Sequence, residues 1–334
     1  MSTLNQNRIV TLNCGLGRDS IAMLMLCIEG RLETEEHGLI LPEDLDCVVF
    51  SNTGCEWPHT YQQIPRVSQM CDDHGIRFII LWKGDDDRDD GPAESWKRID
   101  ERASNGGYHT RPRIMDDFMS RATVASLGKG DCTDNHKIQP IRRLINDISH
   151  VRFGLTNRRW SYEVRQGDRP PHINLIGIAF DERSRAEGGP DGPYYVEECY
   201  PLIDMEIAKE GEAEILDRHG FGDVKKSGCW MCPYQPASWY WALKETQPDV
   251  YRSAVEYEAH ALARNPRMAA TGYKREGRPM TIPEVVDRWR SDNPDATIEA
   301  VLSKSYTRCT KEARKKQRAE LAGQMTIYDA IGAA

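Results

Sequence analysis

The 334-residue sequence contains no long hydrophobic run and no internal repeat. No segment approaches the roughly 20 apolar residues that a membrane-crossing helix needs, so no membrane association is expected. The opening residues, MSTLNQNR, lack the apolar core of a secretory signal, and a cytoplasmic location is therefore expected. Hydrophobic residues make up 39% of the chain and charged residues 29%, a balance typical of a globular protein.

An excess of positive charge is also missing. The formal net charge is −8, which argues against a protein that coats nucleic acid through many non-specific phosphate contacts. Residues 304–318 form a local basic segment within this acidic chain. This segment could therefore still contact the phosphates of a nucleic acid locally.

Disulfide bonds are not expected, although the chain has ten cysteines. These lie scattered at positions 14, 27, 47, 55, 71, 132, 199, 229, 232 and 309. In a reducing cytosol such cysteines do not form a disulfide framework. The closely spaced pair Cys229 and Cys232 instead indicates metal or redox chemistry.

Apolar segments alternate with helical patterns along the first two thirds of the chain. Strands are expected at residues 8–13, 47–51, 77–82 and 173–180, the last of these being the final core strand. Strands separated by helices at this spacing predict βαβ units. The expected fold is therefore α/β, with a parallel twisted sheet and flanking helices.

The remaining segments complete this division into two regions. Helices are expected at 60–72 and 140–149, a polar surface loop at 83–105, and helices only from 205 onward. Residues 1–204 are interpreted as one α/β domain. Residues 205–334 are interpreted as a helical region that carries the Cys-x-x-Cys loop and a basic tail.

The segment between the first strand and its helix has the composition of a phosphate-binding loop. The residues expected to bind nucleotide there are Cys14, Gly15, Leu16, Gly17, Arg18, Asp19 and Ser20. The glycines let the backbone curl around oxygen atoms, and the amides at the helix start face the anion. Arg18 adds positive charge, whereas Asp19 needs Mg²⁺ or a structural hydrogen bond. A turn that merely joins strand and helix is the alternative.

Two common nucleotide motifs are absent from this loop. It lacks the third glycine of the nicotinamide fingerprint and the Lys-[Ser/Thr] ending of a Walker loop. It resembles instead the Ser-Gly-Gly-x-Asp-Ser signature of the PP-loop ATP pyrophosphatase superfamily. Gly17, Asp19 and Ser20 match this signature, whereas Gly15 and Leu16 replace its leading Ser-Gly.

Three further segments resemble the phosphoadenylylsulfate (PAPS) reductase family. Residues 51–61 are similar to its Asp-Thr-Gly…Thr-Tyr segment, with Asn52 in place of the usual Asp. Residues 132–141 are similar to its Cys-Cys-x-x-Arg-Lys-Val-x-Pro-Leu segment, with Lys137 aligned. Residues 176–185 are similar to its strand and polar loop near substrate.

The resemblance implies an adenine nucleotide alpha hydrolase-like fold and a set of site residues. Those implied to bind nucleotide, in addition to the first loop, are Ser51, Asn52, Thr53, Gly54 and Gly177. Those implied to be catalytic are Arg18, Asp19, Lys137 and Arg183. Adenine nucleotide and Mg²⁺ are the implied ligands.

The cysteines are interpreted in the same way. Related iron–sulfur reductases hold a [4Fe–4S] cluster with a cysteine pair and a later Cys-x-x-Cys, which implies Cys132, Cys229 and Cys232 as ligands here. Cys199 is the candidate for a fourth. A Cys-x-x-Cys alone suits Zn²⁺ equally well, so a zinc site and thiols without metal remain the alternatives.

Three functions compete. The first is an ATP-dependent enzyme that adenylates an acceptor, a nucleic acid or a small molecule, and then transfers sulfur from a donor to it. The second is a true PAPS or adenylylsulfate reductase; the Glu-Cys-Gly-x-His segment of those enzymes is absent, and Asp19 and Ser20 are retained. The third is a nucleotide-binding protein without turnover. The oligomeric state, monomer or homodimer, stays open.

The end of the sequence suggests one further partner. Residues 304–321 are expected to form a basic helix, followed by Gln-Met-Thr-Ile-Tyr at 324–328. This pattern resembles short peptides that dock on bacterial sliding clamps, with Ile327 and Tyr328 as apolar anchors. Packing of these two side chains against the body of the protein is the favoured alternative, because short motifs often occur by chance.

Overall fold

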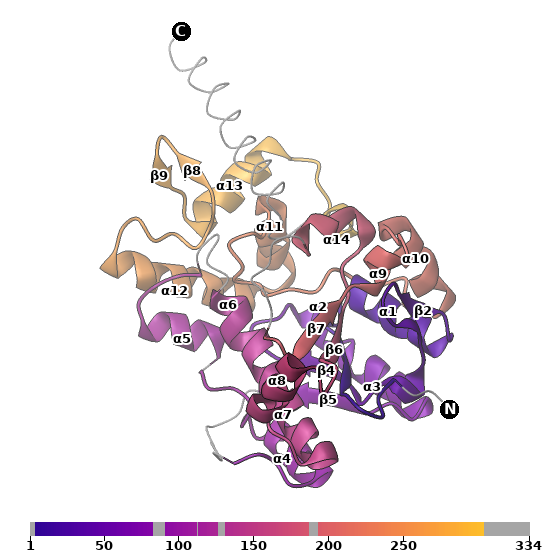
Figure 1. The fold of residues 1–334 in the computed structure, drawn as a ribbon. Coiled ribbons are helices and arrows are strands. Elements are labelled where there is room, and N and C mark those ends of the chain that lie inside the picture. Colours follow the sequence, from indigo (N-terminus) through magenta and orange to yellow (C-terminus); the bar gives the residue numbers. More distant parts are fainter. Residues whose placement is uncertain (1–3, 83–90, 112, 126–130, 187–192, 304–334) are drawn as a thin grey trace. The chain divides into compact units, whose positions relative to one another are not determined.

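The computed structural model describes residues 4–82, 91–111, 113–125, 131–186 and 193–303 (Figure 1). The chain forms two compact units. The first comprises Met1–Pro112 and Thr133–Gly228, and the second comprises Arg113–Cys132 and Cys229–Ala334. Residues 205–228, placed in the helical region by the sequence interpretation, cluster with the first unit. The basic segment and the clamp-like motif lie outside the described residues.

A five-stranded sheet forms the centre of the first unit. Its strands are β1 (Val10–Asn13), β4 (Cys47–Ser51), β5 (Phe78–Leu81), β6 (His172–Ile176) and β7 (Val196–Cys199), in the order β5-β4-β1-β6-β7. Every neighbouring pair is parallel. The expected α/β fold with a parallel sheet is confirmed.

The strand expected at residues 173–180 is confirmed over residues 173–176, but it is shorter than expected and is not the last strand of the sheet. β6 ends at Ile176, and β7 follows it as an edge strand. The sequence of β7, Val-Glu-Glu-Cys, hides it because two of its four residues are acidic and only Cys199 is buried. An edge strand can expose charges in this way, whereas a central parallel strand cannot.

Helices cover both faces of the sheet. In the first unit they are α1 (Arg18–Ile28), α2 (Pro58–Tyr61), α3 (Ile64–Asp73), α4 (Trp96–Ser104), α7 (Gln139–Phe153), α8 (Asn157–Gln166), α9 (Pro201–Asp204) and α10 (Lys209–Arg218). The core on one face joins β1, β4 and β6 to α1, α3 and α10. The core on the other face joins β4 and β5 to α4 and α7.

Two local expectations need correction. The stretch 83–105 is not all loop, because α4 occupies its end: Ser95 caps the helix by accepting from the Arg98 amide at 3.2 Å, and Ile99 and Ala103 enter the core. The helix expected at 60–72 is divided into α2 and α3 at Gln62–Gln63. A short hairpin, β2 (Leu32–Thr34) and β3 (Gly38–Ile40), follows α1.

The second unit is mainly helical. Its elements are α5 (Ile114–Ser120), α11 (Ala237–Thr246), α12 (Pro248–Arg264), α13 (Ile282–Asp292), α14 (Ile298–Ser303) and the two-residue strands β8 (Lys274–Arg275) and β9 (Arg278–Pro279). This hairpin corrects the expectation of helices only. The buried carboxylate of Glu258 accepts from the amides of Ala270 (2.8 Å) and Ile282 (2.6 Å), joining α12 to the start of α13. No described helix is long and apolar enough to span a membrane.

Candidate nucleotide site

The phosphate-loop candidate lies at the centre of the sheet, between β1 and α1. β1 pairs with β4 on one side and β6 on the other, so the order of strands reverses here. Ligands of open α/β sheets bind at such a reversal, at the carboxyl ends of the strands. The loop follows the carboxyl end of β1 directly and therefore occupies the position where a ligand is expected.

Backbone geometry explains why this loop carries a glycine at position 17. A Cβ atom on Gly17 would lie 2.5 Å from the Ser227 hydroxyl oxygen and 2.9 Å from the Ser227 amide nitrogen. Gly17 is extended and caps the N-terminus of α1. The preceding Leu16 has a φ of 55° with its side chain fully buried, so the core holds the loop in a curved form.

Gly177, just after β6, permits a second close approach. A Cβ atom there would lie 2.9 Å from the Asp19 carbonyl carbon and 2.9 Å from the Ser20 amide nitrogen. The first turn of α1 therefore rests against the end of β6. Both glycines were selected by the sequence interpretation, but the partner Ser227 was not.

The first turn of α1 supplies the groups that an anion needs. The first bond into the helix runs from the Ile21 amide to the Gly17 carbonyl at 3.0 Å, which leaves the amides of Arg18, Asp19 and Ser20 without intrahelical partners. The Ser20 hydroxyl donates to the Gly17 carbonyl at 3.2 Å. Amides at a helix start, together with the helix dipole, favour a bound phosphate.

Cys14, the first residue of the loop, is unsuited to nucleophilic attack. Burial raises the pKa of its thiol to about 11, so it is neutral at physiological pH. The thiolate is the reactive form of cysteine. Cys14 therefore contributes packing and backbone to the loop.

A buried ion-pair cluster lies beside the loop in the same unit. Glu182, on the 3₁₀ turn Phe180–Arg185, accepts from Lys226 at 2.7 Å and Arg185 at 2.5 Å, and pairs with Lys209 at 3.2 Å. Although burial opposes ionisation, Lys226 and Arg185 hold the pKa of Glu182 at about 2. Lys209 and Lys226 are 27 and 44 residues from Glu182 in sequence, whereas Arg185 is one turn away. These separations explain why the sequence interpretation missed the cluster.

Glu212 on α10 is the opposite case. Its side chain is fully buried, and neither carboxyl oxygen has a hydrogen-bond partner. Burial, reinforced by the nearby charge of Asp19, raises the pKa of Glu212 to about 9. Glu212 is therefore protonated at neutral pH, next to the loop.

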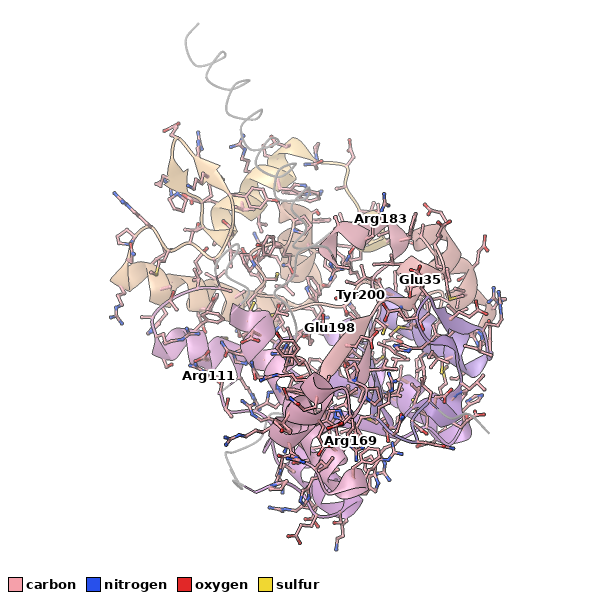
Figure 2. The ribbon with its side chains drawn as sticks, viewed as in Figure 1. Glu35, Arg111, Arg169, Arg183, Glu198 and Tyr200 are labelled. Atoms are coloured by element: carbon pink, nitrogen blue, oxygen red, sulfur yellow. The ribbon has the colours of Figure 1, made fainter. Side chains whose placement is uncertain are left out.

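A pocket of about 240 Å³ opens at the carboxyl ends of the strands. Polar groups from four strands or their following residues line it: Asn13, Cys14, Gly15, Ser51, Asn174 and Glu198; Figure 2 labels Glu198 on β7. Ile141 and Ile145 of α7 provide an apolar wall. The side-chain oxygen of Asn13 is buried without a hydrogen-bond partner, so a ligand with an N–H or O–H donor would satisfy it.

The loop after β4 borders this pocket and is held by its own hydrogen bonds. The Asn52 side-chain oxygen accepts from the Gly54 amide at 2.8 Å and the Tyr61 hydroxyl at 2.9 Å. Thr53 donates to Glu56 at 3.1 Å, and Lys137 pairs with the same carboxylate at 3.1 Å. These bonds bring Asn52, Thr53 and Lys137 together at one end of the sheet. The hydroxyl of Ser51, at the end of β4, donates to the His136 carbonyl at 2.9 Å.

Of the predicted catalytic residues, Lys137 lines this pocket, whereas Arg18 and Asp19 lie on the first turn of α1. Arg183 does not line the pocket either. It is exposed on the 3₁₀ turn, with its guanidinium 4.7 Å from the centre of the Phe180 ring; Figure 2 labels it. Its neighbours Glu182 and Arg185 point into the ion-pair cluster instead. A catalytic role for Arg183 remains a prediction.

The candidate metal ligands divide between the two units. Cys132, Cys229 and Cys232 all belong to the second unit and are partly exposed, and the Cys232 amide donates to the Cys229 carbonyl at 3.2 Å. Cys199 belongs to the first unit, where its sulfur lies 3.9 Å from Glu197. Its ligand atom lies within 4.8 Å of those of His37 and Glu197. The His37 Nε2 atom lies within hydrogen-bonding distance of the Glu197 carboxylate, at 3.1 Å, which explains the grouping without a metal.

No known protein family matches the sequence, and no curated protein matches it. Among solved structures, the chain is similar to the U34-tRNA thiolase NcsA from Methanococcus maripaludis with its [4Fe–4S] cluster, at 15% identity and a TM-score of 0.37. The match covers 91% of this chain and 85% of that chain.

Proposed function

We propose that this protein is a PP-loop enzyme that binds ATP, adenylates an acceptor with release of pyrophosphate, and serves sulfur transfer to that acceptor. The observation that carries the proposal is the loop between β1 and α1. It combines a strand reversal, a glycine without room for a side chain and an open helix start. This combination is a device for binding the phosphates of a nucleotide.

The residues around the loop would divide the work as follows. Amides of the first turn of α1, with Arg18, would bind the phosphates that leave as pyrophosphate and stabilise their growing charge. Asp19 would hold Mg²⁺ against those phosphates. The pocket at the strand ends would take the rest of the nucleotide, with Asn13 accepting from it.

The reaction has two steps. An oxygen of the acceptor attacks the α-phosphorus of ATP, and the bond to the bridging oxygen of pyrophosphate breaks. A sulfur nucleophile then forms a bond to the activated atom of the acceptor, and AMP leaves with the acceptor oxygen. Lys137 would offset negative charge at the α-phosphate, which its position on the border of the pocket supports.

Three cysteines suit an iron–sulfur cluster or a zinc ion. Cys132, Cys229 and Cys232 are partly exposed within one compact unit, whereas the other cysteines of the described chain are buried. Thiolates bind either metal. A bound cluster would supply a place for the sulfur donor. Cys199 is a weaker candidate because it lies among acidic groups, and burial beside Glu197 raises the pKa of its thiol to about 12.

The alternatives are a PAPS or adenylylsulfate reductase and a nucleotide-binding protein without turnover. Asp19 and Ser20 favour ATP cleavage over reduction, and the attacking cysteine segment of the reductases is absent from the sequence. Incubation with PAPS and a thiol reductant tests the first alternative by sulfite release. Incubation with ATP and Mg²⁺ tests the second.

The decisive experiment measures AMP and pyrophosphate formation from labelled ATP. Asp19→Ala and Ser20→Ala are expected to lower the rate at least about 100-fold, since both residues belong to the site. Asp72→Ala, on the exposed face of α3, is the control and should leave it unchanged. Wild-type rates in both loop variants would exclude the loop from the mechanism. Iron, zinc and sulfide analysis after anaerobic purification identifies the metal.

A further inference from the structure

The segment that forms α7 and α8 is basic, although the chain as a whole is acidic. Between positions 139 and 169 the arginines are 142, 143, 152, 158, 159, 165 and 169, and the acidic residues are 147, 163 and 168. Some of this charge is neutralised: Arg159 and Arg169 both pair with Glu163. Among the described residues, Arg142, Arg158 and Arg165 have no carboxylate partner.

Aromatic side chains lie among these arginines. Tyr162 is 53% exposed and Tyr194 is 68% exposed, both high values for large rings. The guanidinium of Arg159 lies 5.1 Å from the Tyr162 ring centre, and that of Arg165 lies 4.8 Å from the Tyr194 ring centre. Each ring is thereby oriented by an arginine while most of its surface stays open.

Helical periodicity places these groups on one face. Arg158, Tyr162 and Arg165 are separated by four and three residues on α8, so they share a side of the helix. The buried Trp160 occupies the opposite side. We call the set Arg158, Tyr162, Arg165 and Tyr194 the α8 face.

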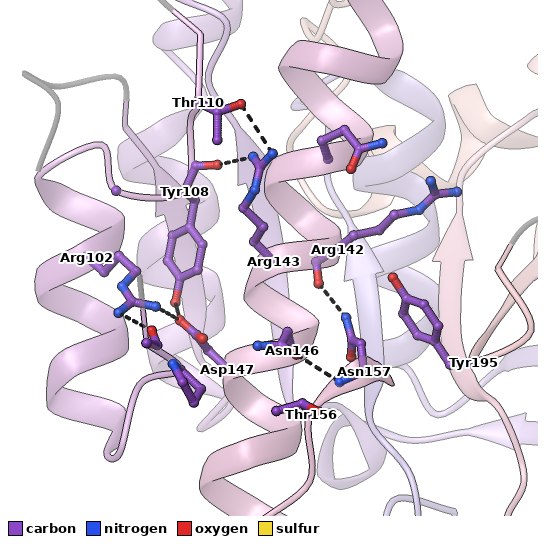
Figure 3. Close-up of a pocket in the computed structure, with 14 residues that line it drawn as sticks. Arg102, Tyr108, Thr110, Arg142, Arg143, Asn146, Asp147, Thr156, Asn157 and Tyr195 are labelled. Atoms are coloured by element: carbon purple, nitrogen blue, oxygen red, sulfur yellow. Dashed lines mark hydrogen bonds and ion pairs between the residues drawn. The ribbon is translucent and has the colours of Figure 1, made fainter. Parts of the chain in front are cut away.

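A second pocket, of about 500 Å³, is lined by residues of α7 and by the first residue of α8 (Figure 3). Tyr195, next to the exposed Tyr194, lines it, and so does Asn157, next to Arg158. The side-chain oxygen of Asn157 is buried without a hydrogen-bond partner. Arg142 lines both this pocket and the smaller pocket at the strand ends; the two pockets therefore meet at this side chain.

We propose that the α8 face binds single-stranded nucleic acid and that the larger pocket receives one nucleotide unit of it beside Arg142. Arginines release counterions from phosphates, and exposed rings stack on bases of any sequence. The pocket volume falls in the usual range of about 300–1,000 Å³ for ligand sites. A base can enter it only when unpaired, since a duplex keeps its bases stacked.

Single-stranded nucleic acid is thereby named as the class of acceptor for the proposed function. The assignment as acceptor rests on the proposed function, whereas binding of the strand does not. A nucleotide held at Arg142 would stand next to the pocket proposed for ATP. This is where an acceptor oxygen must lie to reach an α-phosphate. Binding of the strand itself needs no ATP chemistry.

The test titrates the full chain into fluorescein-labelled 20-nucleotide single strands of DNA and of RNA. Binding is measured by fluorescence anisotropy at two salt concentrations, without ATP. Tyr162→Ala should weaken binding roughly 5- to 100-fold, whereas Tyr162→Phe should retain it, because stacking needs only the ring. Arg158→Ala/Arg165→Ala should weaken binding and reduce the salt slope by about 1.4, for two lost phosphate contacts. Arg142→Ala should reduce the slope by about 0.7.

Two controls make the result decisive. Lys97→Ala/Arg98→Ala removes the same charge from the exposed side of α4 in the same unit and should change affinity less than twofold. A 20-base-pair duplex should bind more weakly than either strand. Equal loss in the control variant, equal binding of duplex, or no binding of either strand would overturn the proposal, and an unchanged Arg142→Ala would overturn the role of the pocket.

The relative affinity for the two strands shows which nucleic acid is the acceptor. Tighter binding of RNA indicates an RNA acceptor, and tighter binding of DNA indicates a DNA acceptor. Failure here is distinguishable from failure of the proposed function. A chain that forms AMP from ATP but binds no strand keeps the function and refutes this surface. A chain that binds single strands through the α8 face but does not turn over ATP supports this surface and refutes the proposed function.

Discussion

Two glutamates of the first unit are equally inaccessible to water but have opposite electrostatic states. Glu182, with three cationic partners, has a pKa of about 2, and Glu212, with no hydrogen-bond partner, has a pKa of about 9. Their solvent exposures are 1% and 0%. The difference shows that partners, and not burial alone, decide whether a carboxyl group in this core is charged.

A third buried glutamate falls between them. Glu258 of the second unit accepts from two backbone amides, and burial raises its pKa to about 7. Amides stabilise the charged form less than cations do, which explains the intermediate value. The three residues form a series in which the partner changes and burial stays constant.

The largest effect is expected at Glu182. Glu182→Ala leaves Lys226, Lys209 and Arg185 without their shared carboxylate, and a buried charge without a partner is costly. We expect the free energy of unfolding at pH 7 to fall by about 3–5 kcal/mol, measured by urea denaturation. In the wild type, the stabilisation from Glu182 should be full above pH 4.5 and disappear as the pH falls toward 2. Unchanged stability would contradict the ion-pair cluster.

Glu212→Gln tests a pH dependence of stability in the opposite direction to that of Glu182. Because the folded pKa is raised, the wild type loses stability between about pH 4.5 and pH 9, at about 1.4 kcal/mol per pH unit. Glutamine has no such titration, so the variant should gain on the wild type by about 2 kcal/mol between pH 5.5 and pH 7. Urea unfolding at pH 5.5, 7 and 8.5 measures this gap. Parallel pH profiles would show that Glu212 is not protonated in the folded protein.

Glu258→Gln is the intermediate case. Glutamine keeps one oxygen acceptor but turns an amino group toward the second backbone amide, so one hydrogen bond is lost. A loss of about 1–3 kcal/mol is expected at pH 7. Hydrogen exchange of the Ala270 and Ile282 amides gives an independent readout, because both should exchange faster. Full protection of both amides in the variant would refute their pairing with Glu258.

The smallest effect is expected at Asp181, whose 2.9 Å pair with Lys209 is 40% exposed on the carboxylate side. Asp181→Ala should cost less than about 1 kcal/mol. The comparison with Glu182→Ala separates burial from charge, since the residues are adjacent and share Lys209. If Asp181→Ala lowered the free energy of unfolding as much as Glu182→Ala, the stability of the cluster would depend on its total charge and not on the burial of the carboxylate.

Much of the nucleotide site could be predicted from the sequence because its signals are local. The strand at 8–13, the glycines at 15 and 17 and the helix start at Arg18 are contiguous, and the periodicity and composition of this segment express its structure directly. Gly177 and the residues after β4 came from resemblance. The structure adds the reason for Gly17 and Gly177, namely the close approach of backbone on two sides.

The missed features depend on long-range contacts. Ser227 lies against Gly17, and Lys226 interacts electrostatically with Asp19, each from more than 200 positions away. No local pattern marks these two residues. Glu212 reads as an ordinary surface residue of a helix until α10 packs on α1. The edge strand β7 carries charges that a strand pattern excludes, and α4 follows an acidic stretch that reads as loop.

The position of β1 in the sequence also determines how long this strand lacks one of its partners during synthesis on the ribosome. This strand is made first, but its partner β6 lies 163 residues later in register, as in the pair Thr11 and Asn174. At about 5–20 residues per second, roughly 8–33 s pass on the ribosome before both edges of β1 can be covered. An apolar strand with an open edge invites association with other chains during that interval. The central strand that organises the site is therefore also the segment for which a nascent chain most needs protection by a chaperone.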